Sequence, residues 1–147
     1  MQYTCEIVIN QPREKVIDLF EDLAYIKEWQ PTFVRVEPIS GELGATGSTS
    51  NMVYKRGKGE MTMLETIVNN NLPDTFVATY DVPSPKVHNI VENRFEEVGA
   101  NQTRWIIDCE FQFGLMMSVM SVFMRGTFRK ETENTMKNFK AFAEKQP

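Results

Sequence analysis

The feature that most constrains the fold of this chain is the long stretch at residues 115–145, which changes from apolar to amphipathic. Its first ten residues are mostly apolar, and in the remainder apolar side chains recur at steps of three and four with charged residues between them. That spacing predicts a helix with one apolar stripe and one solvated face. Gly126 is the one interruption, and it predicts a bend between the two halves. The stripe consists of Phe128, Thr132, Thr135, Met136, Phe139 and Phe142.

The preceding part of the chain is predicted to form the sheet that covers this helix, which at 20 to 30 residues would be about 30 to 45 Å long. Residues 3–9 alternate as a half-buried strand does. Two short helices are expected next, the first beginning at Pro12 and the second capped by Asp22 and ended by Pro31. Six further strands are predicted at 33–39, 48–55, 60–68, 75–82, 86–98 and 102–113. This order is typical of an α+β domain in which seven antiparallel strands curl around the final helix.

Alternation along these strands assigns side chains to the two faces of the sheet. The predicted inner face is aromatic and rich in methionine, and its polar exceptions are Asn89, Asn93 and the Tyr80 hydroxyl. Methionine fills irregular volumes and adapts to what it packs against, as binding surfaces require. A solid core built from the same residues is the alternative, and a different parity would leave the two asparagines on the surface. The inner face is predicted to carry Met61, Met63, Phe76, Ala78, Tyr80, Val87, Asn89, Val91, Asn93, Phe95, Trp105, Ile107, Cys109, Phe111 and Phe113.

Composition limits the classes of function that remain. The length of 147 residues, with 41% apolar and 24% charged residues, fits one globular domain, 1–147. The net charge of -4 gives no support for nucleic-acid binding. The longest apolar run, 111–124, has 14 residues, fewer than the roughly 20 needed to span a bilayer. Since the first residues also lack a signal-peptide pattern, we expect a cytoplasmic protein without stable membrane insertion.

Few residues offer metal or catalytic chemistry. The chain has no spacing typical of metal ligands, of a nucleophile elbow or of a phosphate loop, so neither a metal nor a cofactor is predicted. The two cysteines, Cys5 and Cys109, are expected to be reduced and buried. His88 is the only histidine, and its parity turns it outward.

The carboxylates in the strands are the remaining acid–base candidates. Alternation with apolar neighbours favours the solvated face for Asp108, Glu110, Glu92 and Glu65. Glu65 is less certain, because parity with Met61 and Met63 turns it inward. An inward carboxyl would have a raised pKa and could act as a general acid or base.

Several segments resemble a known superfamily. Gln11-Pro12-Arg13-Glu14-Lys15-Val16 follows the first strand, Trp29-Gln30-Pro31 follows the second helix, and Met63-Leu64-Glu65-Thr66-Ile67 is followed by Asn71-Leu72-Pro73-Asp74. With the order of elements, these segments resemble the START-related polyketide cyclase-dehydrase and lipid transport superfamily (SRPBCC), whose helix-grip fold is shared with plant pollen allergens. The resemblance implies a cavity between the curved sheet and the long helix, usually apolar and open at one end.

Parity and the resemblance together predict a set of ligand-binding residues. Tyr80, Asn89 and Asn93 are expected to give specificity, and Trp29 and Phe33 to lie near the entrance. The predicted apolar lining is Met61, Met63, Phe76, Trp105, Phe111, Phe113, Met116, Met120, Phe123 and Met124.

The leading hypothesis is binding of a small hydrophobic or aromatic ligand in this cavity, for transport or sensing. The alternatives are an enzyme of the cyclase or dehydratase type that uses Glu65, Tyr80 or an asparagine, and an interaction module whose cavity has collapsed. Fold alone does not decide among them.

Overall fold

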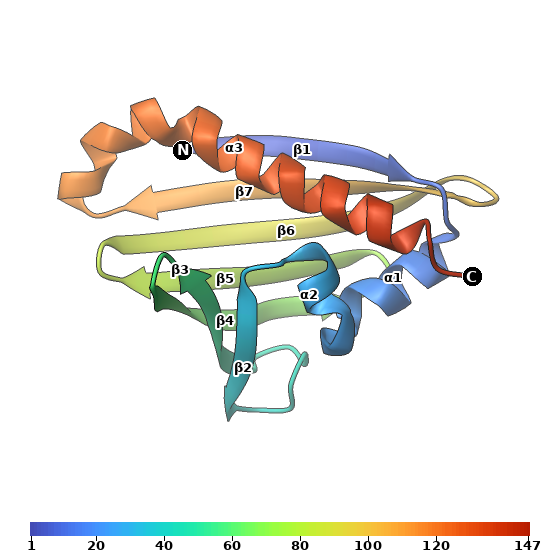
Figure 1. Ribbon diagram of the computed structural model, residues 1–147, viewed down its shortest axis with the longest axis horizontal. Coiled ribbons are helices and arrows are strands. Elements are labelled where there is room, and N and C mark those ends of the chain that lie inside the picture. The colour runs from blue at the N-terminus through green and yellow to red at the C-terminus, as the bar shows by residue number, and fades with distance from the viewer.

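The protein is an α+β domain in which one curved sheet holds a long C-terminal helix (Figure 1). The structure is a computed structural model that describes the backbone of residues 1–147 and all side chains except those of residues 116–123. The strands are β1 (Gln2–Ile9), β2 (Phe33–Ser40), β3 (Thr49–Arg56), β4 (Gly59–Asn71), β5 (Thr75–Pro83), β6 (Lys86–Gly99) and β7 (Gln102–Phe113). The helices are α1 (Arg13–Glu21), the short 3₁₀ helix η1 (Leu23–Tyr25), α2 (Ile26–Trp29) and α3 (Leu115–Ala143).

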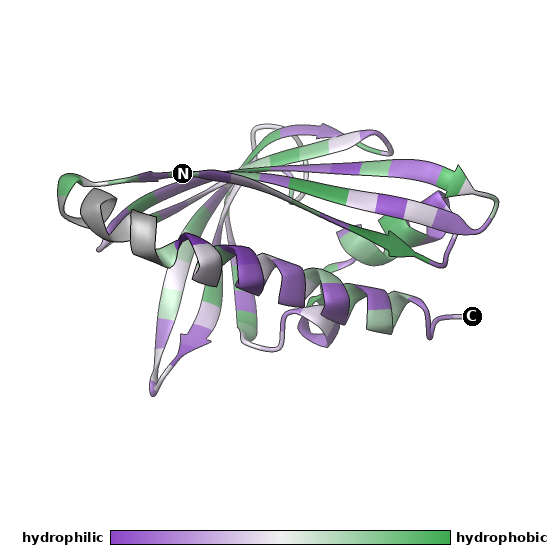
Figure 2. Ribbon diagram, turned by 90° about the horizontal axis from the view of Figure 1, so that it is seen from above, coloured by the Kyte–Doolittle hydropathy of each residue, from purple (hydrophilic) through white to green (hydrophobic). Residues whose placement is uncertain are grey.

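The seven strands form one antiparallel sheet in the order β1-β7-β6-β5-β4-β3-β2. Seen from above, α3 lies along one face of the curved sheet (Figure 2). The predicted fold class is therefore confirmed, and each predicted strand is present with ends that differ by three residues or fewer. The second predicted helix is divided into η1 and α2, and the Asp22 side chain accepts a hydrogen bond from the Ala24 amide at 2.9 Å, as a cap does.

Helix α3 is attached along one edge of the sheet, at β1. The Tyr3 hydroxyl and Thr132 Oγ1 form a hydrogen bond of 2.8 Å. Lys140 Nζ donates to the Val8 carbonyl oxygen at 2.7 Å, and Gln11 Nε2 donates to the last carbonyl group of α3 at 2.9 Å. Because these bonds join the helix to β1 and the turn after it, α3 is fixed in register against the β1–β7 side of the sheet.

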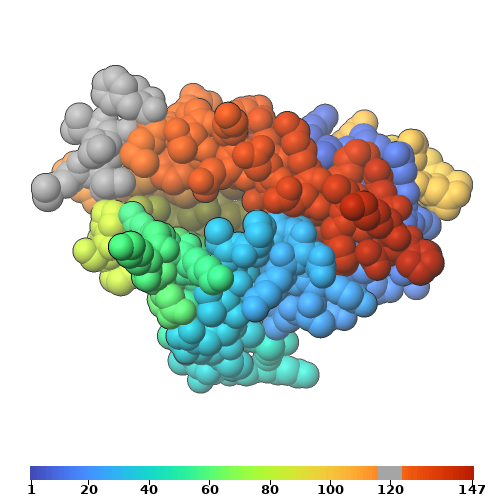
Figure 3. All heavy atoms as spheres, in the orientation of Figure 1, coloured from blue at the N-terminus to red at the C-terminus, as the bar shows by residue number. Residues whose placement is uncertain are grey.

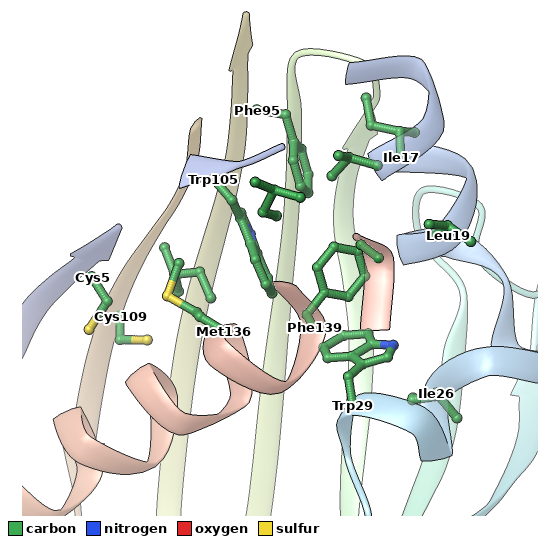
Figure 4. Close-up of a cluster of buried hydrophobic side chains, with 14 of the residues drawn as sticks. Cys5, Ile17, Leu19, Ile26, Trp29, Phe95, Trp105, Cys109, Met136 and Phe139 are labelled. Atoms are coloured by element: carbon green, nitrogen blue, oxygen red, sulfur yellow. The ribbon is translucent and has the colours of Figure 1, made fainter. Parts of the chain in front are cut away.

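A cluster of aromatic rings fills the space between the C-terminal half of α3, α2 and the sheet (Figure 4). Phe139 is fully buried, and its ring centroid lies 5.2 Å from that of Trp29 and 5.1 Å from that of Trp105. Phe95 stacks on the other side of Trp105, and Phe20 of α1 contacts both of these rings edge-on. Aromatic pairs of this kind stabilise a core beyond the area that they bury.

Truncating Phe139 is expected to destabilise the protein strongly. The Phe139→Ala variant should lose about 3 to 5 kcal/mol of free energy of unfolding, since it opens a cavity among rings that cannot collapse into it. Urea denaturation followed by circular dichroism measures the change. Lys137→Ala, an exposed position of the same helix, is the control and should change the value little. A loss below about 1 kcal/mol for Phe139→Ala would show that the cluster is not the core.

Candidate ligand cavity

The inner face of the sheet, α2 and α3 line a cavity with a volume of about 1070 Å³. The space-filling view shows its opening as a hollow between α3, the β3–β4 hairpin and the segment around α2 (Figure 3). Among the lining residues, Lys55, Arg56 and Glu131 are exposed and lie at the rim. The volume is at the upper end of the range found for small-molecule sites.

The register of the strands places polar side chains in one row across the cavity wall. Ser50 pairs with Glu65, Glu65 with Tyr80, Tyr80 with Asn89, and Asn89 with Phe111. Residues that pair directly across strands point to the same face, so all five point inward. Three polar residues among them, Glu65, Tyr80 and Asn89, line the cavity and form its polar row.

The rows on either side of the polar row are apolar. Toward the β3–β4 hairpin they contain Met52, Met63, Val82 and Val87, and toward α1 they contain Ile67, Ala78, Val91 and Cys109. The polar row therefore crosses a part of the sheet that is apolar on both sides, and apolar surroundings with a few polar groups are typical of pockets that orient a ligand.

Burial is the main influence on the titration of Glu65. It raises the pKa of this carboxyl, because a charge removed from water is less stable, and a hydrogen bond from the Tyr80 hydroxyl offsets part of the increase. Tyr80 and Tyr54 also have raised pKa values, first through burial and then through the nearby Glu65 charge. The Tyr54 hydroxyl donates to Gln30 Oε1 at 2.8 Å. A carboxyl and two phenols thus share one desolvated region of the cavity.

The two predicted asparagines differ in their bonding. Asn93 is buried with both ends of its amide hydrogen-bonded: its Oδ1 accepts from Trp105 Nε1 at 3.0 Å, and its Nδ2 donates to the Phe76 carbonyl oxygen at 3.4 Å. The Oδ1 of Asn89 is also buried, but it has no hydrogen-bond partner among the described residues. A buried polar atom without a partner lowers the free energy of unfolding by about 1 to 3 kcal/mol. Asn89 Oδ1 is therefore free to accept a hydrogen bond from a ligand, whereas the Asn93 amide is used in holding the sheet side chains together.

Most of the predicted ligand-binding residues do line the cavity. These are Trp29, Met61, Met63, Phe76, Tyr80, Asn89, Asn93, Trp105, Phe111 and Met124. The side chains of Met116, Met120 and Phe123 lie outside the described residues. That any of the ten lining residues contacts a ligand remains a prediction.

Two predicted positions are not in the cavity lining. Phe33, the first residue of β2, is buried against the ring of Tyr54, its partner in the pairing with β3, with centroids 5.7 Å apart. Phe113 lies beyond the cavity at the end of β7, where its ring stacks on Phe111 at 5.9 Å. Both aromatic rings pack against the rings that line the cavity instead of lining it themselves.

Sequence reasoning missed several lining residues. Tyr54 follows the parity of Met52 in β3, a signal that could have identified it. Phe20 and Tyr3 also line the cavity, although the pattern assigned them only to a helix face and a strand face. Gln30 lies just after α2, where no periodicity applies.

The histidine and the carboxylates that alternation turned outward, His88, Glu92, Asp108 and Glu110, are not among the residues that line the cavity. His88 Nδ1 lies 2.6 Å from Asp81 Oδ1 on the outer face of the sheet, and Arg94 Nη2 donates to Asp108 Oδ2 at 2.7 Å. Cys5 and Cys109 are free and buried, and burial raises the pKa of Cys109 to about 11. Among the described residues, no group of three or more potential ligands is placed to hold a metal ion, and no helix is long and apolar enough to cross a membrane.

A curved antiparallel sheet that holds a terminal helix over an apolar cavity defines a helix-grip domain. The chain belongs to the family described as polyketide cyclase / dehydrase and lipid transport, whose model matches residues 2–144. The predicted superfamily is thereby confirmed.

Solved structures with low sequence identity share this fold. The ZhuI aromatase/cyclase from Streptomyces sp. R1128 is 12% identical with a TM-score of 0.79, over 98% of this chain and 93% of that one. Ara h 8.0201 is 12% identical with a TM-score of 0.74, over 99% of both chains. TTHA0849 from Thermus thermophilus is 14% identical with a TM-score of 0.74, over 97% of both. No curated protein matches the chain significantly.

Replacing Glu65 with glutamine is expected to stabilise the protein at alkaline pH. Because the folded state has the higher pKa, it keeps this proton over a pH range in which the unfolded chain has lost it, and stability falls as pH rises through that range. Glu65→Gln should remove this fall and raise the free energy of unfolding at pH 8 by about 1 to 3 kcal/mol. Urea denaturation at pH 4 to 8 measures it. Glu6→Gln, on the exposed face of β1, is the control, and a Glu65→Gln curve parallel to the parent's would contradict the assignment.

Proposed function

We propose that this protein binds a small hydrophobic or aromatic molecule in the cavity between the sheet and α3. The observation that carries the proposal is the cavity itself, about 1070 Å³ with a mainly apolar lining crossed by the polar row. A ligand of several fused rings would be largely removed from water there, which is the main source of affinity for apolar molecules. Membership in a family described by lipid transport and polyketide cyclisation supports the same class of ligand.

The size of the cavity argues against the collapsed interaction module. That alternative needs an interior with no void larger than a few water molecules, and one water occupies about 30 Å³ in the liquid. The solid aromatic cluster around Phe139 occupies only the end of the domain near α1 and α2. The packed cluster and the cavity therefore lie along different parts of α3, the cluster at Met136 and Phe139 and the cavity at residues 124–135.

Filling the cavity should abolish binding without unfolding the protein. Val91 lines the cavity from the middle of β6, and Ile90 beside it points to the outer face. We expect Val91→Trp to weaken binding of a fluorescent hydrophobic dye by about tenfold or more, a loss of about 1.4 kcal/mol. Fluorescence titration measures the affinity, and mass spectrometry of solvent extracts identifies any molecule that copurifies.

The matched control is Ile90→Trp, which adds the same ring outside the cavity and should leave dye affinity unchanged. Equal weakening by both variants, or no saturable dye binding to the parent protein, would count against the cavity as a binding site. Circular dichroism confirms that each variant is folded.

The second candidate function is enzymatic, of the cyclase or dehydratase type. The observation that favours it is the buried Glu65 carboxyl beside the Tyr80 hydroxyl, since burial raises the pKa of the carboxyl toward the range useful in proton transfer. Such a group could remove a proton from a carbon next to a carbonyl group while the apolar walls hold the substrate. The family description includes cyclases and dehydrases.

Exchange of enolisable protons tests this candidate without knowledge of the natural substrate. The protein is expected to speed hydrogen–deuterium exchange at the α-carbon of 1-tetralone, measured by NMR, and Glu65→Gln should lower that acceleration by about 100-fold or more. Glu6→Gln should leave it unchanged. An acceleration that survives in Glu65→Gln would exclude this carboxyl as the base.

A further inference from the structure

The polar row contains acceptors for which the protein supplies too few donors. The Oδ1 of Asn89 is buried without a partner among the described residues. Glu65 receives a hydrogen bond from Tyr80, but a carboxylate has about four acceptor positions. The nearest phenol protons are already used, since Tyr54 donates to Gln30 and Tyr80 donates to Glu65.

The indole nitrogen of Trp29, another buried group without a partner, does not supply the missing donor. In Figure 4 it points away from Trp105, toward the side on which Leu19 and Ile26 lie. Among the described residues, the open groups of the polar row are therefore two acceptors, the Asn89 oxygen and the Glu65 carboxyl, and one donor, the Asn89 amide nitrogen.

No positive charge lies near the row among the described residues that line the cavity. The two cationic lining residues, Lys55 and Arg56, are exposed at the end of β3. Lys55 is five positions along the strand from Ser50, the partner of Glu65, which corresponds to about 17 Å at 3.3 Å per residue. A negative group placed at the row would meet the Glu65 carboxyl in an apolar surrounding without a compensating cation, whereas a donor group would satisfy both open oxygens.

We propose that the polar row selects ligands whose polar group donates hydrogen bonds and carries no negative charge, as hydroxyl and ammonium groups do. The inference rests on the proposed binding function and narrows it. The ring system of such a ligand occupies the apolar walls, and its donor group lies between Glu65 and Asn89. Fatty acids and other carboxylates are thereby excluded from the deep part of the cavity.

A matched set of pyrene probes tests the selection: pyrene, 1-pyrenemethanol, 1-pyrenemethylamine and 1-pyreneacetic acid, titrated by fluorescence at pH 8. We expect the alcohol and the amine to bind at least about tenfold more tightly than the acid. The Glu65→Gln variant should reduce the difference between amine and acid to about threefold or less. Asn89→Ala, which removes the unpaired oxygen, should weaken the alcohol by about threefold or more relative to pyrene.

The outcomes separate this proposal from the binding function itself. If none of the four probes binds, the proposed function fails. If pyrene binds but the acid binds as tightly as the alcohol and the amine, the cavity is a binding site and the selection is wrong. Glu6→Gln should keep the full discrimination, and its loss in that variant would also overturn the proposal.

Discussion

The attachment of α3 to one edge of the sheet is the interaction on which the rest of the structure depends. Tyr3 is hydrogen-bonded to Thr132, and Lys140 donates a hydrogen bond to the backbone of Val8, so the helix is fixed to β1. The aromatic cluster then fills the space at the α1 end. Strands β3 to β6 curve away from the helix, and the space above them is the cavity. A helix attached centrally would have closed this space, because its apolar stripe would have packed directly on the inner face.

The cavity lowers the stability of the domain, and the packed aromatic end offsets that loss. Side chains that line a void lack neighbours on one side and lose the dispersion contacts of a packed core. Glu65 lowers the stability further because its carboxyl group loses hydration, and Asn89 lowers it because its buried oxygen lacks a hydrogen bond. These groups are the opposite of what stability alone would select. Their presence at one level of an otherwise apolar wall therefore points to a use that involves another molecule.

Sequence periodicity predicted the fold well, because a strand has only two faces and a shift of one residue would invert both. Parity placed Trp105, Tyr80 and Asn89 on the inner face, where the register puts them. Parity left Glu65 undecided, since charge favoured the surface and its neighbours Met61 and Met63 favoured the interior. The structure follows the pattern of the neighbours, since Glu65 lines the cavity.

Hydrogen-bond partners could not be predicted in the same way. Asn89 and Asn93 have equal parity and identical chemistry, and they differ only because the Trp105 indole on β7 reaches one of them. Such features depend on contacts between strands, which a pattern along one strand does not contain. The same holds for Phe33, which was expected at the entrance and is buried where β2 pairs with β3.

The bonding of the polar row also distinguishes binding from catalysis. A catalyst that moves a proton between two sites usually needs a second group to return or receive it. In the described cavity, the Tyr54 proton is held by Gln30 and the Tyr80 proton by Glu65. The other carboxylates of the lining, Glu131 among them, are exposed. One buried carboxyl with unfilled acceptor positions is sufficient to orient a donor group but supplies only half of an acid–base pair, and for this reason we propose ligand binding ahead of catalysis.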